Sequence, residues 1–194
     1  MYANNCGVGI SAGNNSLVDL HNYIHMNSII SIGVNASNNS IFNNNGGSST
    51  NFNILNSNKG IALSKNSGAN IIGAQMQNVN TGLIASSNSM FNLLDSSIAG
   101  PSDYTKVSYG VYGDGNSVGN VYGTSTTGFT TGTGSNTGAH YKATNNSVLF
   151  FDATGPSNLT NTQGTVIGYK VIDTSRGQNT NKPGGGGGGD IPIS

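Results

Sequence analysis

The sequence contains no tryptophan, a single cysteine and only four prolines in 194 residues. It also contains no glutamate, and lysine and arginine together number seven. Cys6 cannot form a disulfide within the chain, and it has no histidine or second cysteine beside it at a metal-ligand spacing. Helix surfaces draw on glutamate, lysine and arginine, so their scarcity disfavours a helical protein. These absences exclude an internal disulfide framework and point away from helices.

Charge is scarce and balanced, because seven aspartates offset seven basic residues. Nucleic-acid binding requires clustered lysine and arginine that release counterions from phosphates, and the sequence has no such cluster. It has no apolar run of about 18 residues for a membrane helix. Residues 1–5 also lack the basic start and apolar run of a secretory signal. We therefore expect neither nucleic acid nor a membrane as a partner.

Asparagine and glycine dominate the composition, with 31 and 30 residues respectively. Both residues, together with the abundant serine and threonine, favour turns and strand borders over helix interiors. The composition therefore predicts an all-β chain with many tight turns.

A short motif recurs six times along the chain, and it decides the fold. Each copy has a glycine, an apolar residue directly after it, and an Asn-Ser pair that begins five residues after the apolar residue. The copies start 22 to 28 residues apart, at Gly9, Gly33, Gly60, Gly82, Gly110 and Gly138. In the last copy Ser147 comes two residues late, so we expect the sixth coil to be irregular.

The motif reads as a strand followed by a corner. Pairs such as Ile10 with Ala12 and Val34 with Ala36 alternate with period two, which places both side chains on one inward face. Asparagine tolerates the left-handed backbone of a sharp corner. If coils stack about 4.8 Å apart, equivalent asparagines can bond along the stack as a ladder. The predicted ladder comprises Asn15, Asn39, Asn66, Asn88, Asn116 and Asn146.

We predict an all-β, right-handed parallel β-helix of about six coils over residues 1–155. The apolar strand candidates near its end predict a capping β segment over 156–182, and residues 183–194 form a glycine-rich tail. A β-sandwich with irregular loops is the main alternative, but it would not explain why the motif stays in phase.

The repeats resemble the pectate-lyase-like β-helix family, and within it the tail spikes and tail fibres of bacteriophages. Strand starts such as Gly82-Leu83-Ile84-Ala85 and Tyr109-Gly110-Val111-Tyr112, with Asn-Ser corners between them, carry the resemblance over roughly residues 7–155. It implies a homotrimer in the virion tail, in contact with other tail proteins and with host cell-surface polysaccharide. We expect no cofactor.

Relatives that cut polysaccharides carry acidic pairs, so the aspartates were considered as candidates. Asp95 and Asp152 hold similar corner positions two coils apart, about 9.6 Å along the axis, at the far edge of the range for two catalytic carboxylates. Asp114 precedes a glycine, which is typical of a turn. We predict no acid–base pair; if the chain is an enzyme, Asp95, Asp114 and Asp152 are its candidates.

Tyrosines are the stronger indication of binding, because sugar rings stack on aromatic faces. The candidates gather in one coil and its loop: Tyr104, Tyr109, Tyr112 and Tyr122. Alternation predicts that Tyr112 points outward and shares a face with Gly110. The alternative is that these tyrosines pack at a subunit interface or against a loop.

His21 and His25 are four residues apart, which suits a metal on a helix but spans about 13 Å on a strand. We expect no metal site. Together these features predict a structural, receptor-recognising part of a phage tail fibre or spike that binds glycan without cleaving it. The alternatives are a polysaccharide depolymerase and a bacterial surface adhesin.

Overall fold

The computed structural model describes residues 1–21, 23–44, 52–101, 108–129, 138–152, 162–163, 166–171 and 179–181. These residues form strands, turns and bends, and no helix occurs among them. Consequently no helix in these ranges could cross a membrane.

Successive coils pass through three strand positions, which we call faces a, b and c. Face a comprises β2 (Val8–Ala12), β5 (Ile32–Ser37), the later parts of β7 (Phe52–Ser64) and β9 (Ala74–Ala85), β12 (Tyr109–Gly113), β15 (Ala139–Ala143) and β17 (Thr162–Gln163). Face b comprises β3 (Leu17–Leu20), β6 (Ile41–Asn44), β8 (Gly68–Ile72), β10 (Met90–Leu94), β13 (Val118–Tyr122), β16 (Val148–Asp152) and β18 (Val166–Val171). Face c comprises β1 (Tyr2–Asn4), β4 (Ile24–Asn27), the early parts of β7 and β9, β11 (Ser97–Ala99) and β14 (Ser125–Thr127).

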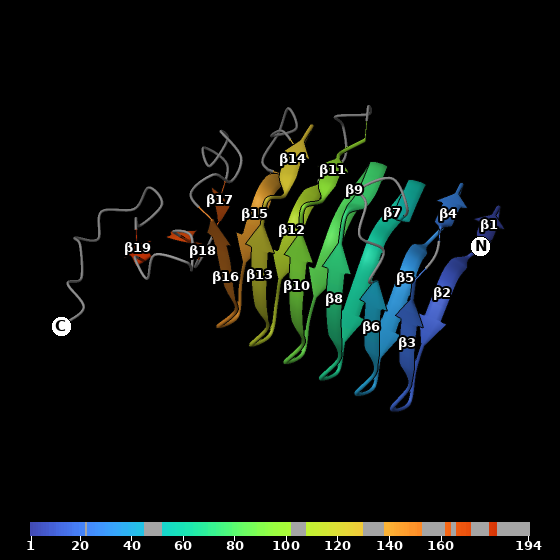
Figure 1. Ribbon diagram of the computed structural model, residues 1–194, viewed down its shortest axis with the longest axis horizontal. Coiled ribbons are helices and arrows are strands. Elements are labelled where there is room, and N and C mark those ends of the chain that lie inside the picture. Colours follow the sequence, from blue (N-terminus) through green and yellow to red (C-terminus); the bar gives the residue numbers. More distant parts are fainter. Residues whose placement is uncertain are drawn as a thin grey trace.

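Within each face, neighbouring strands pair in parallel, each with its equivalent in the next coil. Figure 1 shows these strands side by side along the long axis of the molecule, in the order of the sequence. The predicted all-β parallel β-helix is confirmed. The solenoid has about five turns, which lie between the first and the sixth copy of the motif.

The core is a continuous column of inward side chains. Ile10, Val34 and Leu83, which each follow a motif glycine, are buried, and so are the alanines two residues further on. The predicted period-two alternation is therefore confirmed. Because every coil adds its apolar residues to the same column, no coil needs a core of its own.

The motif glycine lies where the chain enters face a and faces the core. A Cβ on Gly82 would lie 2.5 Å from the carbonyl oxygen of Gly110 in the next coil, and even closer to the Ile98 side chain. At Gly82 a side chain would therefore clash with both neighbours. In β12 the burial pattern shows Gly110 and Val111 both buried and Tyr112 half-buried on the outer side. The prediction that Tyr112 shares a face with Gly110 was wrong, because Gly110 and Val111 are both buried and the alternation is interrupted between them.

The sixth coil is regular, and the prediction that it is irregular was wrong. Val111 pairs with Tyr141 and Tyr112 with Lys142, so His140 and not Gly138 occupies the glycine position. Ser147 then stands seven residues further on, as the serine does in the other copies. His140 is buried, and its Nδ1 lies 2.8 Å from Thr126 Oγ1.

The corners between faces a and b carry the Asn-Ser pairs. All six motif asparagines have a left-handed backbone, with φ between 61° and 65°. Four of the six side-chain amides donate to the previous coil: Asn39 donates to Asn15 over 3.1 Å, and Asn66, Asn88 and Asn116 continue the ladder over 3.2 to 3.3 Å. Asn146 occupies the same corner position, with φ of 63°.

The motif serine forms a second, buried ladder beside the asparagines. Ser67 Oγ donates to the Ser64 carbonyl over 2.7 Å and accepts the backbone N–H of Ser40 at 3.3 Å. Ser89 and Ser117 repeat this arrangement in the following coils. The serine hydroxyl therefore forms hydrogen bonds with backbone groups at the corner that have no partner in the β-sheet.

Beyond the sixth copy, β18 pairs in parallel with β16, and β19 (Asn179–Asn181) then pairs antiparallel with β18. Both strands lie within the predicted capping segment, 156–182. The predicted glycine-rich tail, 183–194, lies outside the described residues.

Candidate binding site on the outer side of face a

Two tyrosines and a lysine form a cluster on the outer side of face a. Tyr109 and Tyr112 come from β12, and their ring centroids lie 5.2 Å apart at an angle of 41°. The Lys142 ammonium, from β15 in the next coil, lies 4.6 Å from the Tyr109 centroid and 5.2 Å from that of Tyr112. Lys142 Nζ also donates to the Tyr109 hydroxyl over 3.1 Å. A cation above two rings orders the rings.

A hydrogen-bond chain extends from the cluster to the next corner. Thr144 Oγ1 donates to Asp114 Oδ1 over 2.8 Å, so the Tyr112 hydroxyl, 3.1 Å away, donates to Thr144. Asn145 Nδ2 donates to the same carboxylate oxygen over 2.6 Å. The Asp114 carboxylate therefore holds Tyr112 in place through Thr144.

The interrupted alternation at Gly110 and Val111 brings the two rings together. Residues three apart on a regular strand point to opposite sides, but two consecutive inward residues place Tyr109 and Tyr112 on one side. The site then offers two half-buried rings, an ammonium and hydroxyl groups. This combination suits a ligand with C–H faces and hydroxyl groups, because rings stack on the former and polar groups bond the latter.

The structure separates the four predicted tyrosines. Tyr109 and Tyr112 share the cluster, whereas Tyr122 ends β13 on face b and is 43% exposed. Tyr104 lies outside the described residues. Sequence reasoning did not identify Lys142 and Thr144. The sequence alignment started the sixth copy at Gly138, which displaced Lys142 by two positions. When the copy starts at His140, Lys142 aligns with Tyr112.

The candidate carboxylates lie at different places in the fold. Asp114 follows β12 at the corner between faces a and b, while Asp95 follows β10 at the corner between faces b and c and is exposed. Asp152 is the last residue of β16. Because Asp114 accepts hydrogen bonds from Thr144 and Asn145, its observed role is structural.

The two histidines singled out by spacing have separate surroundings. His21 lies 3.4 Å from Asp19 in an exposed ion pair. His25 stacks on Tyr23, with ring centroids 6.3 Å apart. Across the described ranges, no three histidine, cysteine or acidic side chains gather closely enough to hold a metal ion.

Comparisons with protein-family models, with curated proteins and with solved structures found no match for this chain.

Proposed function

We propose that this chain is a rigid β-helical segment of a phage tail fibre or tail spike that binds a host surface glycan without cleaving it. The cluster of Tyr109, Tyr112 and Lys142 on the outer side of face a carries the proposal. Stacked coils fix the position of each outward side chain, so the cluster is held in place before a ligand arrives, which limits the entropy lost on binding.

Several properties of the cluster support a sugar as the ligand. The two tilted rings offer apolar faces, and hydroxyl and ammonium groups lie at their edges. Binding without cleavage agrees with the hydrogen bonds that engage Asp114, and with the separate corners of Asp95 and Asp114. Hydrolysis needs two carboxylates about 5 to 9.5 Å apart across the scissile bond.

The proposed setting is a homotrimer in the virion tail, joined to other tail proteins and facing host cell-surface polysaccharide. A parallel β-helix is compatible with a tail spike and also with a bacterial surface adhesin, which would use the same cluster. Sedimentation of the full chain tests the assembly. Three times the 19.7 kDa of one chain supports the trimer, and a monomer at micromolar concentration overturns it.

A glycan array tests the binding site. We expect the wild-type chain to bind at least one uncharged surface glycan, and the Tyr109→Ala/Tyr112→Ala variant to bind it at least tenfold more weakly. Tyr2→Ala is the matched control, because Tyr2 is 72% exposed on face c. No binding by the wild-type chain, or a double variant that binds every glycan as tightly as the wild-type chain does, would overturn the proposal.

The polysaccharide that the chain binds can also be used to test the alternative that the chain is a depolymerase. Release of reducing ends or unsaturated sugars from the bound polysaccharide, lost in Asp95→Asn or Asp114→Asn, would show that the chain cleaves its ligand. We expect no release.

A further inference from the structure

The outer side of face b carries two parallel rows of side chains that run along the solenoid axis. The apolar row contains Leu17, Ile41, Met90 and Val118, which are 37% to 64% exposed, with Gly68 in its middle. The amide row lies beside it, two residues further along each strand, and contains Asn43, Asn70, Asn92 and Asn120. In the first coil Asp19 occupies the amide position, so the four amides belong to the coils of Ile41, Gly68, Met90 and Val118.

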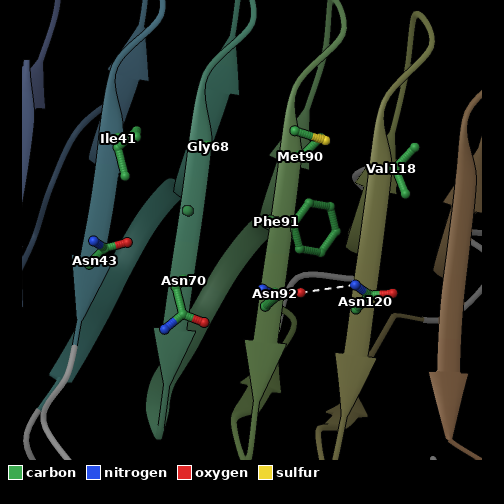
Figure 2. A pocket seen from close by; sticks show the side chains of 10 residues that line it. Ile41, Asn43, Gly68, Asn70, Met90, Phe91, Asn92, Val118 and Asn120 are labelled. Carbon is green, nitrogen blue, oxygen red and sulfur yellow. Dashed lines mark hydrogen bonds between the residues drawn. The ribbon is translucent and has the colours of Figure 1, made fainter. Parts of the chain in front are cut away.

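The apolar row has a gap at Gly68, and the gap opens a hollow. Its volume is about 400 Å³, and it lies between Ile41 and Met90, with Asn43, Asn70 and Asn92 along one side. Figure 2 shows Gly68 without a side chain between these residues, and the amides arranged along the same stretch of the face. The hollow is open to solvent and crosses several coils, so a ligand would lie along the axis.

The amide row bonds to itself at one end of the hollow but not at the other. Asn120 donates to Asn92 over 2.9 Å, as a ladder would. Neither Asn43 nor Asn70 has a side-chain hydrogen bond with any residue that the structure describes, and Figure 2 shows a dashed line only between Asn92 and Asn120. At the corner, by contrast, the ladder bonds at each step from Asn15 to Asn116. The Asn43 and Asn70 amides are thus available to a ligand.

The chemistry of the two rows restricts the ligand. A side-chain amide offers one acceptor and two donors, so it pairs well with another amide group. The neighbouring Ile41 and Met90 side chains suit a methyl group. The lining contains no charged residue. An acetamido group combines an amide with a methyl group and is uncharged, so it matches one amide and one apolar position together.

The size of the face argues against a second copy of this chain as the occupant. Five or six coils about 4.8 Å apart, each with five residues about 3.3 Å long, give an area of roughly 400 Å². A stable protein interface buries about 800 Å² on each partner. A linear polymer needs less area, because it lies in the hollow and contacts both rows.

We infer that this face is a second binding site, distinct from the tyrosine cluster, for a linear, uncharged polymer of N-acetylated amino sugars. The chain of sugars lies along the axis over Gly68. Its acetamido groups bond the Asn43 and Asn70 amides and place their methyl groups against Ile41 and Met90.

Titration with oligomers of N-acetylglucosamine, and with glucose oligomers of the same lengths, tests this inference by calorimetry. We expect affinity to rise with length up to about four sugars, because four amides line the row. We also expect glucose oligomers to bind at least tenfold more weakly, because they lack the acetamido group.

Gly68→Lys should abolish this binding by filling the hollow. The substitution should be accommodated, because a Cβ on Gly68 would meet its nearest neighbour, the Met90 carbonyl oxygen, at 3.8 Å. Ser97→Lys is the matched control, since Ser97 is exposed on face c. Asn70→Leu should keep the fold and reduce the preference for acetylated sugars at least tenfold.

Three results would overturn the inference: no binding of N-acetylglucosamine oligomers, equal affinity for glucose oligomers, or full binding by Gly68→Lys. A wild-type oligomer that Gly68→Lys converts to a monomer, without oligosaccharide binding, would identify the face as a subunit interface and also overturn it. Tyr109→Ala/Tyr112→Ala should leave this binding unchanged, so the two proposals can fail separately.

Discussion

At the scale of single residues, the asparagine corners show why the sequence is so rich in this residue. All six motif asparagines adopt a left-handed backbone, and those from Asn15 to Asn116 also bond to one another through their side-chain amides. Few residues satisfy both demands, because most side chains destabilise the left-handed conformation by about 1–2 kcal/mol. Composition and spacing alone were therefore enough to locate these corners.

Substitutions of Asn66 separate the contribution of the left-handed backbone from that of the amide ladder. Asn66→Ala should reduce the free energy of unfolding by about 2 kcal/mol, because it loses both the backbone preference and the ladder bonds to Asn39 and Asn88. Asn66→Gly keeps the backbone conformation available and should cost about 1 kcal/mol less. Urea unfolding measures both. Equal losses would show that the left-handed backbone contributes nothing.

The buried His140 side chain should make folding stability depend on pH. Burial lowers the pKa of the His140 imidazole below its usual value of 6.5. Between that lowered value and 6.5 the unfolded chain binds a proton that the folded chain does not, so folding stability falls as pH falls through this window. We expect the thermal midpoint to decrease on acidification below 6.5.

His140→Gln is the test variant for this effect. It retains a polar side chain near Thr126 but does not titrate, so it should reduce the loss of stability on acidification. An identical pH profile for His140→Gln and the wild-type chain would contradict the assignment.

At the scale of strands and corners, the two glycines Gly82, on face a, and Gly68, on face b, have opposite effects on stability when they are substituted. Gly82→Ala should destabilise the fold by about 3 kcal/mol, because the new Cβ would overlap Ile98 and the Gly110 carbonyl. Gly68→Ala should be neutral or stabilising by about 0.5 kcal/mol, since its Cβ has space and alanine loses less backbone freedom on folding. Denaturant midpoints compare the two. Equal effects would mean that the motif glycine does not face the core.

The sequence predicts a strand where the number of residues between the motif glycine and the corner is the same in every coil. From the motif glycine to the Asn-Ser corner the spacing does not vary, so faces a and b and their inward residues were identifiable. The connection from face b to the next glycine varies in length. That variation allowed Gly138 to be mistaken for the sixth start, because it is followed by an apolar alanine as the motif requires.

The sites were less predictable, because they depend on neighbours in adjacent coils. Lys142 became visible beside Tyr112 only once the register of the sixth coil was known. The amide row on face b did have a signal, since Asn43, Asn70, Asn92 and Asn120 each stand four residues after a corner asparagine. Which amides bond to each other is set by side-chain conformation, and spacing does not encode it.

At the scale of the whole molecule, the solenoid separates structure from recognition. The inward column and the corner ladders maintain a fixed spacing between coils, so outward residues can vary without cost to the core. Face a then presents aromatic rings, and face b presents amides beside apolar side chains. The two faces offer different chemistry to an extended ligand from one rigid body.

A crystal structure tests whether the tyrosine cluster on face a binds a glycan. The ligand should be the strongest-binding glycan among those that the Tyr109→Ala/Tyr112→Ala variant binds more weakly. If the cluster is the binding site, a sugar ring contacts Tyr109 and Tyr112, with hydroxyl groups near Lys142. Sugar density elsewhere on the molecule, with the cluster unoccupied, would contradict the proposal.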